Sequence, residues 1–203
     1  MLGINKEQAE ELLDKYIKDD IVKMHCLESE AIMRELAKHF NEDEDDPAVA
    51  EAMAGEWGII GLLHDIDWDL TKNNLREHTV KAVEILKQAG ASEFLIETII
   101  SHGYGSELCG INQDKVRTTK IQHALAAAET LTGLIIASAL VQPDKKLSSV
   151  KLESLKKKFK TKSFAAKCDR EIIRECEKIG LALDEFLRIG LKALQGISDK
   201  LGL

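Results

Sequence analysis

The sequence has little proline and few aromatic residues: two prolines, and aromatics at 4% of 203 positions. So little proline, together with 31% charged residues, favours a helix-rich fold and argues against a β-sandwich, collagen-like repeats or disorder. The low aromatic content leaves few rings on which the bases of a single strand could stack. We therefore expect no long nucleic acid as a partner.

The sequence also has no CxxC pair, because its four cysteines are scattered. This spacing gives no support to a zinc ribbon or a thioredoxin-like redox site. The N-terminal stretch MLGINKEQAEELLDKY has no apolar core behind a basic start, and we expect no apolar run near the roughly 18 residues of a membrane span. These absences predict a cytoplasmic protein with reduced thiols and no membrane partner.

The net charge of -7 is distributed unevenly along the chain. Residues 1–110 carry 24 acidic and 10 basic side chains, whereas residues 111–203 carry 11 acidic and 18 basic ones. The basic excess lies in the segment 145–170. An acidic body with one basic segment argues against a general duplex binder, and it allows a small anionic ligand or a homo-oligomer.

Apolar residues recur at helical spacings of three and four along most of the chain, with no strand-like alternation and no internal repeat. The pattern predicts helices at about 20–40, 47–64, 75–89, 93–101, 116–141, 163–179 and 184–201. Asp46 should cap the second of these, with Pro47 at its first position. We expect one all-α domain over residues 1–203, with a core at about 20–142 and a C-terminal helical extension at about 143–203.

The sharpest local signal is the segment LLHDID at residues 62–67, where His64 and Asp65 end an otherwise apolar helix. Adjacent residues lie about 100° apart on a helix and do not share a face. At a helix end, however, the backbone departs from this geometry and both side chains can turn toward one metal ion. A carboxylate beside so apolar a run needs a partner, and a divalent cation is a suitable one.

In this context the sequence resembles the HD-domain metal-dependent phosphohydrolases, whose pattern is a histidine, an adjacent His-Asp pair and a late aspartate on an apolar helix. Here the pattern consists of His25, then His64-Asp65, with Glu129 at the place of the late aspartate. The resemblance covers roughly residues 20–140 and implies a helical bundle of the HD type. Glu129 is one methylene longer than aspartate, so it either ligates the ion, reaches it through water, or does neither.

Three further positions bear on this resemblance. The segment 62–67 is similar to the HDIG form of the motif, with Asp67 where that form has glycine, which changes the loop after the motif. His78 and His102 fall where two-metal members of the family place extra ligands.

The resemblance implies one divalent ion held by His25, His64, Asp65 and, if it ligates, Glu129. Asp65 would bridge to a second ion held by His78 and His102. Mixed imidazole and carboxylate ligands suit Mn, Fe, Co, Ni or Zn better than Ca. The implied reaction is metal-assisted hydrolysis by an activated water, with His64 and Asp65 at its catalytic centre.

The implied substrate is a small phosphate mono- or diester, nucleotides included. Lys72 and Arg76 are the cations nearest in sequence for its phosphate, and Trp68 is a candidate for stacking against a base. Two alternatives are a non-catalytic HD-fold module that binds a metal or a nucleotide, and a helical scaffold whose C-terminal extension mediates oligomerisation.

Overall fold

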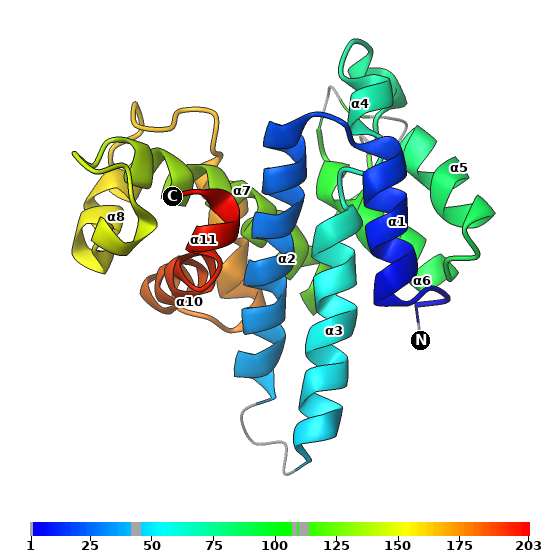
Figure 1. Ribbon diagram of the computed structural model, residues 1–203, viewed down its shortest axis with the longest axis horizontal. Coiled ribbons are helices and arrows are strands. Elements are labelled where there is room, and N and C mark those ends of the chain that lie inside the picture. Colours follow the sequence, from blue (N-terminus) through cyan, green and yellow to red (C-terminus); the bar gives the residue numbers. More distant parts are fainter. Residues whose placement is uncertain (1, 42–45, 107–108, 110–113) are drawn as a thin grey trace.

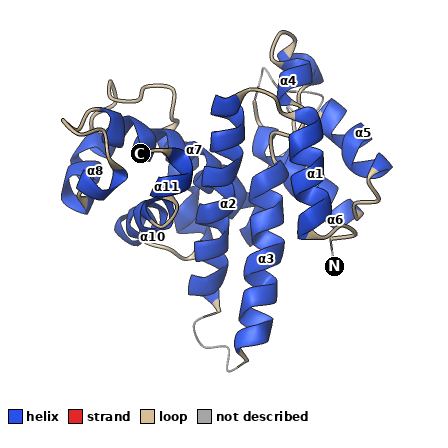
Figure 2. Ribbon diagram, in the orientation of Figure 1, coloured by secondary structure: helices blue, strands red, loops and turns tan. Residues whose placement is uncertain are grey.

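Helices and turns make up the part of the protein that the computed structural model describes, namely residues 2–41, 46–106, 109 and 114–203. No strand occurs within these ranges (Figure 2). The prediction of an all-α fold is therefore confirmed.

The elements follow one another from blue to red in Figure 1. The first half contains α1 (Lys6–Tyr16), α2 (Asp20–Phe40), α3 (Pro47–Leu63), α4 (Trp68–Thr71), the 3-10 turn η1 (Leu75–Glu77), α5 (Val80–Gln88), α6 (Glu93–Ile100) and η2 (Ser101–Gly103). The second half contains α7 (Lys120–Leu140), η3 (Leu147–Ser149), α8 (Leu152–Lys160), α9 (Arg170–Ile173), η4 (Arg174–Ile179), α10 (Leu183–Gln195) and α11 (Ser198–Leu201).

Helices α2 and α3 lie side by side in the middle of the molecule (Figure 1). Local signals define where they begin. The Asp46 side chain accepts a hydrogen bond from the Ala48 N–H, and Pro47 occupies the first turn of α3, both as predicted. In α2 the capping residue is Asp19, whose side chain accepts from the Ile21 N–H.

Helices α2 and α3 approach each other closely at Gly61. A Cβ atom at this glycine would lie 2.6 Å from the Ser29 carbonyl oxygen, so only glycine allows the two backbones to approach this closely. Gly61 lies three residues before His64, and Ser29 lies four residues after His25. The close crossing therefore brings these two histidines together from separate helices.

Helix α7 packs against α2 and α3 (Figure 1). It begins at Lys120, later than the predicted position 116, where Thr119 and Gln122 form a capping box. This helix is long and apolar enough to cross a membrane, which contradicts the expectation that no apolar run comes near that length. Of its most apolar stretch, 67% is buried by the rest of the protein, as in a core helix.

The C-terminal segment packs onto the same central helices: α10 contacts α2 and α7, and α9 and η4 contact α7. One cluster of buried apolar side chains runs through both parts of the chain, from Leu36 on α2 and Leu131 on α7 to Phe186 and Leu194 on α10. Burial of such side chains stabilises the fold by about 1.5–3 kcal/mol for each large one.

Three predicted helices are interrupted, and three others had not been predicted. The range 75–89 breaks at His78 and Thr79, where Thr79 has a φ of 69°. In the range 163–179 the helix begins only at Arg170, whose guanidinium donates to the carbonyls of Phe159, Phe164, Ala165 and Cys168 and so holds the preceding turns. The range 184–201 is interrupted at Gly196. The helices that had not been predicted are α1, α4 and α8.

Candidate metal centre

His64 and Asp65 lie in the turn that follows α3. The His64 side chain is 1% exposed, and its Nδ1 lies 2.8 Å from the Gly61 carbonyl oxygen. Because a carbonyl only accepts hydrogen bonds, Nδ1 carries the proton. The Nε2 lone pair is then left to face the interior of the site.

His25 points at the same space from α2. Its Nδ1 lies 3.0 Å from the Thr132 hydroxyl, which itself donates to the Glu129 carbonyl. The hydroxyl proton is thus already used, so the hydroxyl oxygen accepts from the His25 Nδ1–H. The Nε2 atoms of His25 and His64 lie 3.1 Å apart.

His78 is placed by the break in the chain before α5. Its Nδ1 donates to the fully buried Asp67 carboxylate at 2.8 Å, and the other oxygen of Asp67 accepts from the Ala82 N–H at 2.9 Å. Thr79, with its left-handed backbone, redirects the chain immediately after this histidine. Asp67 therefore fixes both the ring of His78 and the first turn of α5.

His102 lies in η2, where its Nδ1 donates to the Ile99 carbonyl at 2.7 Å. Its loop is held by Arg117, which donates to the carbonyls of Ser101, His102 and Tyr104 at 3.0–3.2 Å. The same guanidinium makes two bonds of 2.8 Å to Glu175, in the C-terminal segment. The backbone of His102 is thus tied to a part of the chain far away in sequence.

These four histidines converge on Asp65. Its Oδ2 lies 3.8 Å from the Nε2 of His25 and 3.5 Å from that of His64, while its Oδ1 lies 3.4 Å from the Nε2 of both His78 and His102. The Nε2 atoms of His78 and His102 are 3.0 Å apart. Two groups that could hold a metal ion result, His25–His64–Asp65 and Asp65–His78–His102, with one carboxylate oxygen facing each.

The electrostatics of the centre favour a cation. Burial lowers the pKa of His64 to about 3, although Asp65 opposes the shift, so the imidazole keeps its lone pair at neutral pH. Burial alone would raise the pKa of Asp65, but His64 and His102 hold it well below its usual range. Burial also lowers the pKa of His102, yet the Asp65 carboxylate outweighs it and raises this pKa to about 9.

The donor set fits a divalent transition metal. In each histidine Nδ1 donates to a protein acceptor and Nε2 faces the centre, the arrangement that orients imidazole ligands in metal sites. Paired Nε2 atoms at 3.0–3.1 Å would repel each other through their lone pairs unless a proton or a metal ion lies with them. Imidazole nitrogen with carboxylate oxygen suits Mn, Fe, Co, Ni or Zn.

Glu129 does not belong to either group of ligand atoms among the described residues. Its Oε1 accepts from the Thr130 hydroxyl at 2.7 Å. Burial raises the pKa of its carboxyl, and the nearby charges of His25 and His102 partly oppose this shift. Glu129 is thus close enough to His25 and His102 for their charges to affect its pKa, but it is not a member of either group of ligand atoms.

A family model described as the HD domain matches residues 22–139, more than half of the chain. The chain belongs to the HD-domain family. The match includes both histidine pairs, Asp65 and Glu129, and it confirms the resemblance to the HD-domain metal-dependent phosphohydrolases. No curated protein and no solved structure matches the chain.

The three residues predicted to bind substrate lie in different settings. Trp68 packs edge-on against the His78 ring, with centroids 5.3 Å apart, and joins the apolar core. Lys72 pairs with Asp69 at 2.8 Å, and Arg76 is exposed on η1. Trp68 thus contacts a histidine of the centre, whereas the structure brings neither cation into contact with the described ligand atoms.

Sequence reasoning missed the residues that hold the histidines in place: Asp67, Thr132, Arg117 and Glu175. Asp67 had been noted only as a departure from the HDIG form. The HD-domain structure gives it a specific contact, because its carboxylate accepts the His78 Nδ1–H. The available sequence signal for this role was an acidic residue two positions after Asp65, at the end of an apolar segment.

Proposed function

We propose that this protein hydrolyses a small phosphate mono- or diester with the help of one or two divalent ions. The observation that supports this proposal best is the position of Asp65, with one carboxylate oxygen toward each histidine pair. His25, His64 and Asp65 would hold one ion. Asp65, His78 and His102 would hold a second, with Glu129 near both groups.

A bound divalent ion supplies positive charge to the phosphate oxygens and lowers the pKa of a coordinated water toward neutrality. The protein contributes orientation. Each Nδ1–H is fixed by Gly61, Thr132, Asp67 or Ile99, so the four Nε2 atoms are held toward one space before a substrate arrives.

Substrate reaches this centre from the side of His25. The His25 side chain is 28% exposed, compared with 1% for His64 and 3% for His78. Asp65 is intermediate at 13%. The phosphate group therefore approaches along α2, next to the open edge of the Asp65 carboxylate.

The proposal is tested by metal content and by activity together. Protein purified without chelator should carry at least one transition metal per chain, measured by elemental analysis, and the double substitution His64→Ala with Asp65→Ala should abolish it. Hydrolysis of p-nitrophenyl phosphate and its bis ester with added Mn should be lost in the same variant.

His39 provides the matched control, because it lies on α2 with His25 but outside both ligand groups. His39→Ala should retain metal and activity. Metal retained by the double variant would disprove the centre. Metal binding without hydrolysis of any ester would instead favour the non-catalytic HD-fold module.

The substrate's identity, the cytoplasmic location and a homo-oligomeric assembly stay predictions. A panel of phosphate mono- and diesters that includes nucleotides is the most informative next measurement, because specificity depends on the shape of the surrounding pocket.

A further inference from the structure

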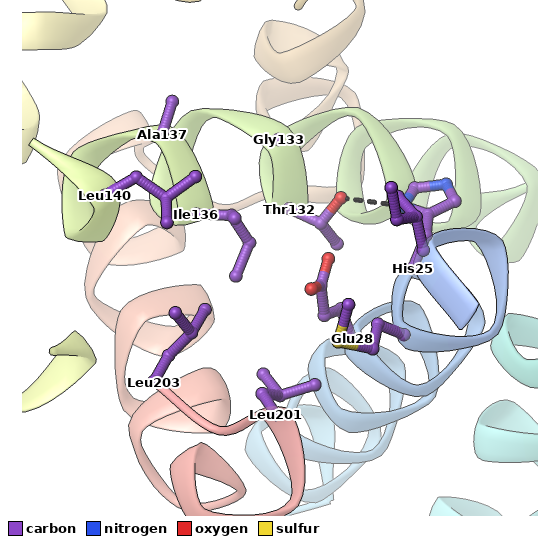
Figure 3. A pocket seen from close by; sticks show the side chains of 11 residues that line it. His25, Glu28, Thr132, Gly133, Ile136, Ala137, Leu140, Leu201 and Leu203 are labelled. Carbon is purple, nitrogen blue, oxygen red and sulfur yellow. Dashed lines mark hydrogen bonds between the residues drawn. The ribbon is translucent and has the colours of Figure 1, made fainter. Parts of the chain in front are cut away.

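A cavity of about 520 Å³ lies beside the metal centre, between α2, α7 and the C-terminal α11 (Figure 3). This volume is within the range of small-molecule sites. Most of its walls are aliphatic, contributed by Ile21, Met24, Ile136, Ala137, Leu140, Leu201 and Leu203. No Phe, Tyr or Trp lines it, and the imidazole of His25 is the one ring among its lining residues.

One acidic side chain lies among these aliphatic walls. Glu28 is only 6% exposed, and its carboxyl group points into the cavity (Figure 3). Within the described part of the chain, no hydrogen bond or ion pair reaches this carboxyl group. Burial raises its pKa to about 7, and His25 only partly opposes the shift. No fully buried side-chain polar atom among the described residues lacks a partner, so the Glu28 oxygens are open to the cavity. A bound hydrogen-bond donor would meet them in an otherwise apolar setting.

The cavity borders the metal centre at His25 and Thr132, which line it. On one side His25 faces the cavity, and on the other its Nε2 faces His64 and Asp65. His25 is also the most exposed of the four histidines. A molecule in the cavity is therefore adjacent to the accessible edge of the centre.

We propose that this cavity binds an aliphatic group carrying a hydrogen-bond donor, either an ammonium or a hydroxyl, with Glu28 as the acceptor. The mostly aliphatic walls, which contain no Phe, Tyr or Trp, favour an aliphatic group over a nucleobase. In the proposed hydrolysis, this aliphatic group would be part of the phosphate ester. That assignment rests on the proposed function. Binding of the aliphatic group alone does not depend on it.

The direct test measures by calorimetry how the protein binds three probes that each contain a linear chain of six carbon atoms: hexylamine, hexanol and hexanoate. Hexylamine and hexanol should bind, and hexanoate should bind at least about tenfold more weakly, because its carboxylate faces Glu28. Glu28→Gln, which keeps the shape but removes the charge, should greatly reduce the preference of hexylamine over hexanoate. Equal binding of all three probes to wild type and variant would overturn the assignment.

Two further variants distinguish loss of probe binding at the cavity from loss caused by a general effect on the fold. Ile136→Trp should fill the cavity and abolish binding of hexylamine and hexanol. Glu35→Gln is the matched control on the same helix, because Glu35 pairs with Lys192 outside the cavity and its loss should leave probe binding unchanged. If Ile136→Trp is folded by circular dichroism and still binds both probes, the cavity is not their site.

A final comparison distinguishes failure of this inference from failure of the proposed function. The His64→Ala, Asp65→Ala variant should still bind hexanol, since its cavity is intact. The wild type should hydrolyse 6-aminohexyl phosphate with a KM at least about tenfold lower than that of methyl phosphate. Equal KM values would overturn the cavity's role. Probe binding without hydrolysis of either ester would leave the cavity assigned and contradict the proposed hydrolysis.

Discussion

The two histidine pairs that flank Asp65 are held by different means. His25 and His64 extend from two long helices whose backbones meet at Gly61 and Ser29. His78 and His102 instead occupy breaks in the chain, one before α5 and one in the η2 turn. Helix packing orients the first pair, whereas Asp67 and Arg117 hold the second through polar contacts. One half of the centre thus depends on close packing and the other on satisfied buried polar groups.

Removal of Arg117 should have the largest effect and should act on the second pair. Arg117→Met would remove the donor of the Ser101, His102 and Tyr104 carbonyls. It would also leave Glu175 with His123 and Lys178 but without its two guanidinium bonds. Breaking a buried ion pair by removing one partner costs about 3–5 kcal/mol. Chemical denaturation should show a loss of about 3 kcal/mol, and metal titration should show weaker binding.

The control for this change is Arg174→Met, which breaks the exposed pair with Glu177. Exposed pairs contribute about 0–1 kcal/mol, so this variant should unfold close to wild type. If Arg117→Met behaved like the control, polar contacts would not be what holds the second pair.

Gly61→Ala should have the next largest effect and should act on the first pair. The added methyl group meets the Ser29 backbone, which cannot move aside as a side chain would. Overpacking of this kind costs about 1–3 kcal/mol. We expect a lower free energy of unfolding and weaker metal binding by His25 and His64.

Gly55 on the same helix is the matched control, because a Cβ there meets nothing within 4 Å. Gly55→Ala should stabilise the protein by about 0.5–1 kcal/mol through helix propensity alone. A stabilising effect at both glycines would show that the two helices can separate without cost.

Asp67→Asn should have a smaller effect on stability but a distinct effect on the second pair. It keeps an oxygen for the His78 Nδ1–H but replaces the oxygen that accepts from the Ala82 N–H by an NH2 group. It also removes the negative charge that strengthens the imidazole as a ligand. Changes of this kind reduce metal affinity by about 10–100-fold. A competition titration with a chelator measures it. Asp69→Asn, with the same change of charge two residues on, should leave the affinity unaltered.

The smallest effect is expected from pH. Burial alone would raise the pKa of Glu175, but Arg117 and His123 outweigh it and hold the pKa below its usual value near 4.5. A depressed acid stabilises the folded state above its unfolded pKa, and this contribution is lost as pH falls through the folded pKa. Between about pH 4.5 and that lower pKa, Arg117→Met should lose less stability than wild type on acidification. Unfolding curves at stepped pH measure this, and parallel curves would contradict it.

Local signals in the sequence were enough to predict the first pair. The apolar period, Asp46 and Pro47 define α3, and the adjacent His-Asp pair marks its end. His25 lies on a regular helix and His64 directly follows one, so spacing and motif order were enough to locate both histidines.

The second pair could be listed but not placed. A helix through 75–89 would have pointed His78 elsewhere, and the left-handed backbone of Thr79 is imposed by tertiary packing that no local preference indicates. The contact between Arg117 and Glu175 spans 58 residues, so no periodic pattern shows it. The turns before Arg170 were missed for the same reason, since one guanidinium holds carbonyls that the sequence does not mark.

The hydrogen bonds from Arg117 to Glu175 bear on which fragments of the protein can fold. The matched family region ends at residue 139, yet the carboxylate that anchors the His102 loop lies beyond it. A fragment of residues 22–139 would carry every proposed metal ligand and still lack that anchor, along with the α10 surface that covers α2. We therefore expect that the smallest piece able to fold around this centre is longer than the matched family region.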